Sequence, residues 1–533
     1  ANAQPHDLFF YSEPIEMIAG GVQPPDVFLN ASAVLERQFV AFAMDNWVKS
    51  GIEEQAVPRK LGACLNKLKK TPIDFFPFNF LNYVQTNIGT LYRKFIVMFE
   101  EHLTKESINA LNLFARGEDL VRSPMHVKVL DAFLSISEQR GSLRKNIRDL
   151  KKMIDELEKK PEDSSFEEEL KGLNDERNAL TAVVRGINNK NIFNFLSEEG
   201  LLPNYAFPES GIVLKAILYR SQQPDEKGES KQRYERVLYE YQRAASAAIS
   251  ELAPANNFYA GGRKLTVDQI DLSTRQVTKW RLCPNCSYAE EDVTGRNVAS
   301  CPRCGSVEWT DSGQVRSMLR VQMVYSEEDY NKSLIGDEER RSRTFYLKQM
   351  LVDVKDEDIL SAYRVGTEEN PFGYEFVRKA TLREINFGEN DIVGEKLSVA
   401  GVEDVRTGFK ICSSCGKVQP KDEKVAKHSM TCRARKQLLN NPFEECLFLY
   451  REFDTEALRI LIPSTTADWS TSRLESFVAG FMLGMRSYFG NVDHLNVCIS
   501  EVPVPESGFR KQYLVVYDSV PGGTGYLKQL MDS

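Results

Sequence analysis

Paired cysteines are the residues of this sequence best suited to chemistry. Two C-x2-C pairs form the pattern C-x2-C-x14-C-x2-C and consist of Cys283, Cys286, Cys301 and Cys304. Each pair places two thiolates on one edge of a tetrahedron, and a hairpin between the pairs can bring all four sulfurs to one zinc ion. The spacing predicts a four-cysteine zinc site, with two unrelated redox pairs as the alternative.

The segments beside these cysteines predict a zinc ribbon over residues 278–310. Residues 278–282 and 307–310 have the composition of short β-strands, and a proline after the first cysteine of each pair stiffens the turn. Because all four ligands come from the protein, no coordination position remains for a water molecule. Such a site stabilises a fold and does not hydrolyse a substrate.

A second group of metal ligands follows the pattern C-x2-C-x12-H-x3-C and consists of Cys412, Cys415, His428 and Cys432. A helix over residues 424–435 would place His428 and Cys432 one turn apart on one face. We therefore predict a second structural zinc site, again with four protein ligands. Cys446 lies beyond this group in an apolar strand, and we expect it to be buried without a metal.

A glycine-rich turn near the end of the sequence is a candidate anion site. An apolar strand ends at Asp518, and Gly522, Gly523 and Gly525 lead into a helix. Backbone N–H groups at such a turn can bind a phosphate, so these four residues are candidate nucleic-acid contacts. The lysine of a nucleotide-binding P-loop is absent, so the turn is not an NTP site. The alternative is a tight turn that needs glycine only for its backbone conformation.

Basic residues do not form one continuous stripe. Arg433, Arg435 and Lys436 lie on the expected zinc helix, where they could contact phosphates or form a solvated charged face. His494 lies near a strand start, where we expect a structural role. No Ser/His/Asp or paired-carboxylate arrangement is evident, so the sequence offers no catalytic residues.

The composition is that of a globular protein. The 533 residues are 42% hydrophobic and 27% charged, which excludes collagen-like, mucin-like and wholly disordered classes. The net charge of −8 argues weakly against a nucleic-acid binder but allows a local basic groove. No apolar run is long enough to cross a membrane and no secretory signal is visible, so we expect a cytoplasmic location without a membrane partner. Because both ends look cut, we expect a segment of a longer protein.

Helices dominate the first part of the chain. We expect a helical region over residues 1–130 and an antiparallel coiled-coil hairpin over residues 131–198. The hairpin is predicted from two heptad-like apolar series on either side of a Pro/Ser turn at residues 161–165, with Arg177 interrupting the second series. Such a hairpin is either a purely structural arm or an arm that binds a protein partner.

Strands dominate the remainder. We expect a β-rich region with the zinc ribbon over residues 199–400 and a C-terminal zinc-binding α/β domain over residues 401–533, which makes the whole chain an α+β multidomain protein. The predicted strands cover residues 212–219, 277–282, 317–325, 344–354, 380–387, 447–453, 457–462, 494–502 and 513–516, and a predicted helix covers residues 474–489.

Five stretches form an ordered series along the sequence: His6-Asp-Leu-Phe-Phe-Tyr11 with Pro24-Pro25; Gly200-Leu-Leu-Pro-Asn-Tyr-Ala-Phe-Pro208; Ile249-Ser-Glu-Leu-Ala-Pro254 with Gly261-Gly262; the cluster of Cys412, Cys415, His428 and Cys432; and Thr455-Glu-Ala-Leu-Arg-Ile460 with residues 518–526. Together they resemble the C-terminal half of large bacterial DEAD/DEAH-box superfamily 2 helicases. That half ends in a zinc-binding domain formerly of unknown function.

The resemblance implies an ATP-dependent DNA helicase or translocase, in genome maintenance or phage defence. The sequence contains no phosphate-binding loop, DEAH box or arginine-finger motif, so ATP and Mg²⁺ would bind in motor domains outside it. This region would then be an accessory part that guides nucleic acid, with DNA implied by the resemblance, and couples the motor to partners. A second hypothesis is a protein-interaction scaffold that docks a nuclease or another partner. A third is an independent enzyme at the turn that contains Asp518.

Overall fold

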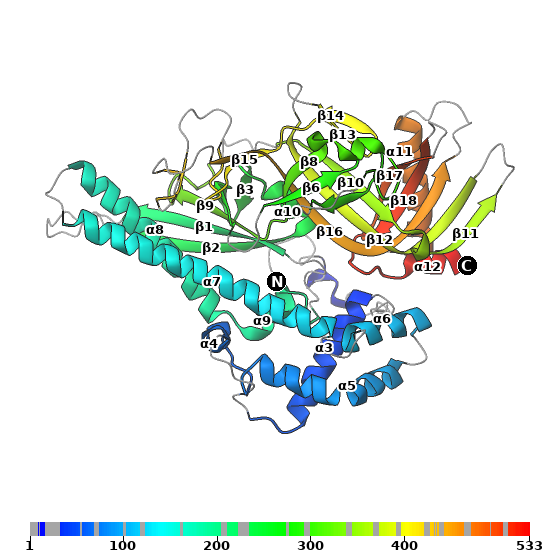
Figure 1. Cartoon of the computed structure of the whole chain (residues 1–533), viewed down its shortest axis with the longest axis horizontal. Helices are drawn as coiled ribbons and strands as arrows, with labels where there is room; N and C mark the ends of the chain where they lie inside the picture. The colour runs from blue at the N-terminus through cyan, green and yellow to red at the C-terminus, as the bar shows by residue number, and fades with distance from the viewer. Residues whose placement is uncertain are drawn as a thin grey trace.

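The computed structural model describes residues 9, 11–15, 32–53, 56–68, 74–99, 103–117, 123–159, 164–203, 211–221, 234–272, 277–292, 299–336, 344–365, 372–390, 396–419, 427–430, 432, 434–435, 442–462, 471–490, 492–504 and 510–532. Long helices dominate the part before residue 200 and strands dominate the part after it, as Figure 1 shows. This mixture agrees with the predicted combination of helical and β-rich regions. None of the helices within these ranges is both long and apolar enough to cross a membrane.

The first helices form a body with one apolar core. They are α3 (Ser32–Lys49), α4 (Leu61–Lys67), α5 (Phe78–Phe99), α6 (Lys105–Arg116) and the short α9 (Ile192–Glu198). Polar side chains fix where two of them begin, because Thr104 caps α6 and Asn191 caps α9 by accepting hydrogen bonds from backbone N–H groups. Aromatic residues fill much of the core, and its fully buried rings are those of Phe39, Phe80, Phe95 and Phe195, with Phe133 contributed by the helix α7 (Pro124–Leu157).

Two longer helices each have one end packed in this core and extend outward from it. They are α7 (Pro124–Leu157) and α8 (Ser164–Asn189), which lie side by side on the left of Figure 1. Ser123 caps α7, and Pro124 occupies the first turn, where proline is tolerated. The predicted apolar series faces inward, with buried side chains at Leu143, Leu150, Ile154, Leu173, Val184 and Ile187. The two helices are therefore present where the heptads predicted them, and their coiled-coil form stays a prediction.

A four-stranded sheet follows, with the strand order β2-β1-β9-β5. Its strands are β1 (Gly211–Ser221), β2 (Tyr234–Ala244), β5 (Gln269–Ile270) and β9 (Met323–Asp329). On one face, Leu214 and Leu218 pack against α10 (Ala245–Glu251) and the hairpin of β3 (Asn257–Ala260) and β4 (Arg263–Thr266). Side chains alternate along a strand, so Lys215, Ile217 and Tyr219 face the opposite side.

The larger sheet is built around one long strand, β16 (Phe443–Ile462). Its main order is β10-β12-β16-β8-β6-β7. Beside this series, β11 pairs with β12, β15 and β18 pair with β16, and β17 pairs with β18. These strands are β6 (Thr278–Leu282), β7 (Ala289–Glu291), β8 (Val315–Leu319), β10 (Tyr346–Val354), β11 (Ile359–Val365), β12 (Phe372–Glu389), β15 (Phe409–Cys412), β17 (Leu495–Pro503) and β18 (Arg510–Asp518). A separate hairpin joins β13 (Lys396–Val399) and β14 (Val402–Val405).

The C-terminal half of β16 supports an α/β unit. β18 pairs with both β16 and β17, and the helices α11 (Thr471–Phe489) and α12 (Tyr526–Asp532) share an apolar core with these strands. Leu474, Leu514 and Leu527 lie in that core. The predicted helix at residues 474–489 and the strands at residues 494–502 and 513–516 are confirmed within a few residues.

The strands predicted at residues 447–453 and 457–462 are in fact one strand, β16. The polar residues between them interrupt the apolar pattern, but each has a partner in the folded chain. Thr381 donates a hydrogen bond to Asp454 at 2.7 Å, and the N–H of Gly525 donates one to Glu456 at 2.7 Å. Tertiary contacts therefore keep the strand continuous where the local pattern breaks.

Residues 317–325, predicted as one strand, belong to two. β8 pairs with β6 and β16 in the larger sheet, whereas β9 pairs with β1 and β5 in the smaller one. Residues 320–322 carry the chain from one sheet to the other. Apolar and polar residues alternate without a break from Leu319 to Met323, so the sequence pattern does not reveal the crossing.

Candidate metal centres

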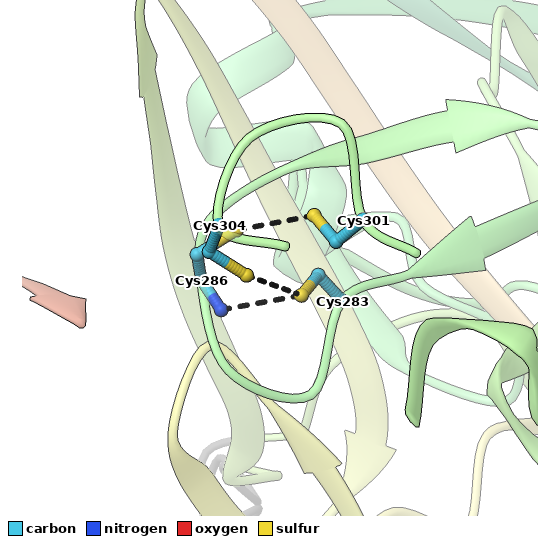
Figure 2. A group of neighbouring side chains, drawn as sticks. All are labelled: Cys283, Cys286, Cys301 and Cys304. Atoms are coloured by element: carbon cyan, nitrogen blue, oxygen red, sulfur yellow. Dashed lines mark hydrogen bonds between the residues drawn. The ribbon is translucent and has the colours of Figure 1, made fainter. Parts of the chain in front are cut away.

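Four cysteine sulfurs converge next to β6 and β7, and Figure 2 shows the side chains directed toward one another. The Sγ atoms of Cys283 and Cys304 are 3.6 Å apart, and those of Cys286 and Cys301 are 3.7 Å apart. Sulfurs that bind one zinc ion tetrahedrally at about 2.3 Å are separated by about 3.8 Å. The four cysteines could therefore hold one zinc ion, as their spacing predicted.

Backbone hydrogen bonds shape the turns that carry these cysteines. The Cys283 N–H donates to the carbonyl of Tyr288 at 3.0 Å, and the Cys301 N–H donates to the carbonyl of Ser306 at 2.9 Å. The Cys286 N–H also points at the Cys283 sulfur, 3.4 Å away. N–H groups aimed at a sulfur stabilise its thiolate, the form that binds metal.

Trp309 covers this first site. Its side chain is only 1% exposed, packs with the four cysteines and lies 5.5 Å from the Tyr288 ring. It is presented by a 3-10 turn, η2 (Val307–Thr310), so the predicted strand at residues 307–310 is wrong. Arg281 donates a hydrogen bond to the Trp309 carbonyl at 2.7 Å and thereby fixes the turn to β6. The need to bury one large ring explains why the segment turns rather than extends.

The second set of ligands joins the end of β15 to the segment before β16. The Sγ atoms of Cys412 and Cys432 are 3.6 Å apart, and His428 Nδ1 lies 3.7 Å from the Cys432 sulfur and 4.0 Å from that of Cys415. The Phe443 ring stacks on the imidazole at 5.5 Å and holds its orientation. These three sulfurs and one nitrogen can also hold one zinc ion.

The helix predicted at residues 424–435 is not present in the described part of that segment. Residues 427–430 form a loop and 434–435 a turn. The Cys432 N–H donates to the carbonyl of Ser429 at 3.0 Å, a three-residue turn that brings His428 and Cys432 together without a helix. The i, i+4 spacing of His428 and Cys432 thus predicted the ligands correctly but not the backbone conformation that carries them.

This metal-binding loop is attached to α8. The N–H of Met430 donates to the Glu176 carboxylate at 2.6 Å, and the Met430 side chain packs with Leu150, Ile154 and Leu173. Gly172 faces the same methionine, whose Cε atom occupies the space that a β-carbon at position 172 would need. The second metal centre therefore contacts the outer part of the α7–α8 pair.

In each ligand set, hydrogen bonds between the ligands shift the pKa values of the cysteines in opposite directions. Hydrogen bonds with Cys283 and Cys286 lower the pKa of Cys301, and a hydrogen bond with Cys415 lowers the pKa of Cys412. Hydrogen bonds with Cys283 and Cys301, followed by burial, raise the pKa of Cys286, and a hydrogen bond with Cys412, followed by burial, raises the pKa of Cys415. Metal ligation requires the thiolate form, and a bound cation would favour loss of the cysteine protons in both sets.

Gly416, directly after Cys415, offers a test of the second centre. Its φ is 73°, and a β-carbon there would lie 2.0 Å from the carbonyl oxygen of Ile270. That backbone is held in place because the Ile270 N–H donates to the Gly416 carbonyl at 2.9 Å. We expect Gly416→Ala to lower the free energy of unfolding by roughly 2–5 kcal/mol, measured by urea denaturation, through left-handed strain and overpacking together.

Gly305, directly after Cys304, is the matched control. Its φ is 75°, but no atom lies within 4 Å of the position that a β-carbon would take. Gly305→Ala should therefore cost only about 1–2 kcal/mol of left-handed strain. Equal losses for the two variants would contradict the account of the second centre.

The glycine-rich turn is bonded to carboxylates of the protein itself. Asp518 is fully buried and accepts hydrogen bonds from the N–H groups of Val520 and Thr524, both at 2.8 Å, and from the Thr524 hydroxyl. Gly522, Gly523 and Gly525 all have positive φ. These features are those of a structural turn, and phosphate contact by Asp518 and the three glycines stays a prediction.

His494 and Glu456 join Asp518 in one buried polar cluster that the sequence did not reveal. His494 Nε2 lies 3.0 Å from the Thr524 hydroxyl oxygen and 3.8 Å from Asp518 Oδ2. Burial and then the charge of Asp518 raise the pKa of Glu456 to about 7. Because Asp518 is inaccessible and its oxygens are engaged, we do not propose an enzyme at this turn.

The predicted basic contacts have different outcomes. Arg433 and Lys436 lie outside the described residues, whereas Arg435 is exposed and lines a cavity of about 1030 Å³ beside the second metal centre. Cys446 lies in β16 with its sulfur 3.6 Å from the Arg406 carbonyl, partly buried and outside both ligand sets.

No family model matches the chain. Among curated proteins, the chain is similar to Druantia protein DruE of Escherichia coli (strain UMEA 4076-1), with 21% identity over 577 residues and 98% of this chain covered. The chain spans 28% of the length of that relative. Among solved structures, it is similar to the DUF1998 helicase MrfA bound to DNA, with a TM-score of 0.25 and 10% identity over 60% of this chain and 28% of that one.

Proposed function

We propose that this chain is an accessory region of a helicase-related protein, which guides DNA beside the motor and couples the motor to a partner. The observation that carries this proposal is the ordered series of five sequence stretches. Similarity to DruE over 98% of the chain supports a relationship along the same span. Phage defence or genome maintenance is the proposed process, and ATP hydrolysis would take place in motor domains outside this sequence.

In this proposal both metal centres hold structural zinc. Each has four protein ligands, and a closed tetrahedral set leaves no position at which a water molecule could be activated. One ion would fix the ribbon at residues 278–310, and the other would fix the loop of a C-terminal zinc-binding domain at residues 401–533. The other predicted boundaries, at residues 130, 198 and 400, belong to the same proposal.

The α7–α8 pair is the proposed antiparallel coiled-coil arm. With 34 residues and a rise of about 1.5 Å per residue, α7 is roughly 50 Å long. Its residues from Met125 to Leu143 pack in the helical core, so the outer arm begins near Leu150. Its outer end contacts the second metal centre through Met430. An arm braced in this way can hold a fixed position relative to DNA or to a protein partner.

Filter binding of the purified chain to labelled single- and double-stranded DNA tests the proposed function. We expect binding at about 50 mM salt that weakens steeply as salt rises, because phosphate contacts release counterions. Failure to bind either form of DNA at low salt would contradict a DNA-guiding role.

A protein-interaction scaffold is the second candidate function, favoured by the net charge of −8 and by the projecting arm. Leu143 and Ile187 pack in the helical core, so a test deletion should remove only the outer arm, residues 150–173. Loss of partner pull-down with intact DNA binding would favour the scaffold. Loss of DNA binding with intact pull-down would favour the DNA-guiding role.

A further inference from the structure

The cavity of about 1030 Å³ lies where three parts of the fold meet. The helices α7 and α8 form one wall, and the face of the four-stranded sheet that carries Ile217 and Tyr219 forms another. The loop of the second metal centre, with His428 and Arg435, forms the third. This volume is slightly above the range of about 300–1,000 Å³ that is typical of ligand pockets, and it is sufficient for a nucleotide.

Two buried polar atoms at this cavity have no hydrogen-bond partner among the described residues. They are the hydroxyl of Tyr325, whose side chain is 7% exposed, and the Oδ1 atom of Asp268. The second oxygen of Asp268 accepts a hydrogen bond from Lys417 at 2.8 Å, so one acceptor position stays open. An unpaired buried polar atom costs about 1–3 kcal/mol, so a ligand that supplied partners to these two atoms would recover that free energy.

The missing partners define the chemistry of that ligand. Tyr325 needs an acceptor for its O–H, and Asp268 needs a donor for its free oxygen. Leu180, a partly exposed side chain of α8, also lines the cavity and offers an apolar surface to a flat ring. A nucleobase has both a ring face and an edge that carries donors and acceptors side by side.

Exposed cations line the same cavity. Lys145 of α7 and Arg435 of the metal-binding loop are both exposed to solvent. Five carboxylates also line the cavity. Glu176 accepts from the Met430 N–H at 2.6 Å, Asp271 from Gln139 at 2.8 Å, and Asp268 and Glu327 from Lys417 at 2.8 and 3.0 Å, whereas Asp149 lies one turn from Lys145 on α7. Exposed cations beside a polar floor match a phosphate attached to a base.

We propose that this cavity binds one nucleotide of a single DNA strand, with the base at Tyr325 and Asp268 and a phosphate at Lys145 and Arg435. The inference rests on the proposed function and names the site at which DNA would be held. A single strand is required because a base must leave its pair to reach a buried floor.

Fluorescence anisotropy with a labelled twelve-nucleotide single strand and the full chain tests the site. We expect the double variant Lys145→Glu, Arg435→Glu to weaken binding at least tenfold. The slope of log affinity against log salt should fall by about 0.7 for each phosphate that the variant no longer neutralises. Lys151→Glu, which also replaces an exposed lysine of α7 but lies outside the cavity, should change affinity less than twofold.

The outcomes separate this inference from the proposed function. No binding by the unmodified chain contradicts the proposed function itself, whereas equal binding by the unmodified chain and the double variant contradicts only the site. Competition by a free mononucleotide distinguishes the two sources of the ligand. Displacement of the strand at micromolar mononucleotide would assign the cavity to a free nucleotide and overturn the single-strand proposal.

Tyr325→Phe removes one oxygen and keeps the ring. If the hydroxyl binds a base, this variant should lose about tenfold in affinity for the strand without losing thermal stability in its free form. If the hydroxyl is instead bonded within the protein, stability should fall and affinity should not, which would contradict its role in the cavity.

Discussion

Replacing Cys412 by Ser is expected to reduce the zinc content of the chain from two ions to one and to destabilise it strongly. Cys412 is fully buried at the end of β15, and its sulfur lies 3.6 Å from that of Cys432. Metal-binding energy is folding energy at such a site, about 10–16 kcal/mol in zinc-finger peptides. We therefore expect a loss of roughly 3 kcal/mol or more in the free energy of unfolding, with zinc measured by elemental analysis.

Cys446→Ser is the matched control for this variant. Cys446 is close to the second centre in sequence but belongs to neither ligand set, and a serine hydroxyl can still donate to the Arg406 carbonyl. It should keep two zinc ions and lose no more than about 1 kcal/mol. If Cys412→Ser retained both ions, or if the two variants were equally destabilised, the second centre would not be structural.

Cys412→Ser should also weaken the contact between the metal-binding loop and the α7–α8 arm. The loop that carries His428 and Cys432 donates the Met430 N–H to Glu176 of α8 and packs the methionine against Leu173. Without metal, this loop is no longer held through its two metal ligands, His428 and Cys432. Hydrogen exchange should therefore rise in α8 around Leu173 while it stays unchanged in α5, which packs in the core of the helical body.

Glu456→Gln is expected to change how stability depends on pH. Burial, and next the charge of Asp518, raise the pKa of Glu456 from 4.5 to about 7 in the folded protein, although the N–H of Gly525 and the charge of Lys528 act in the opposite direction. A carboxyl whose pKa is raised on folding binds its proton more tightly in the folded state. The unmodified chain therefore loses stability as pH rises from about 4.5 through 7.

Once the pH is above 7, the free energy of unfolding has fallen by about 3 kcal/mol in total, because each pKa unit is worth about 1.4 kcal/mol. The glutamine of the variant has no proton to lose and keeps an oxygen that can accept from the Gly525 N–H. The variant should therefore resemble the unmodified chain at pH 5 and exceed it in stability at pH 8, as measured by urea denaturation at both values. Glu445→Gln, at an exposed position of the same strand, should show no such difference. A pH profile for Glu456→Gln parallel to that of the unmodified chain would contradict this interpretation.

Both metal centres could be predicted because their ligands follow short, local spacings. A C-x2-C turn needs only four residues and closes by its own backbone bonds, such as that from the Gly305 N–H to the Cys301 carbonyl at 2.9 Å. The backbone around His428 could not be predicted in the same way. A helix and an irregular loop both satisfy the spacing of His428 and Cys432, and contacts with α8 favour the loop.

The polar cluster around Asp518 could not be predicted from local sequence patterns, because its members are far apart in the sequence. Glu456 lies 69 positions from Gly525, and His494 lies 30 positions from Thr524. Only the pairing of β16, β17 and β18 brings them together. Long-range pairing with β12, in which Thr381 lies opposite Asp454 and Ala380 opposite Thr455, likewise explains why the polar residues 454–456 do not end a strand. Helices α7 and α8, whose apolar series is local, were located directly.

X-ray absorption at the zinc edge tests the central claim, two closed structural metal centres, most directly. The ligand sets contain seven cysteine sulfurs and one histidine nitrogen in total. The account predicts two zinc ions per chain with a first coordination sphere of sulfur and nitrogen in that ratio, and no oxygen. Fewer than two ions, or an oxygen ligand that marks an open coordination position, would contradict it.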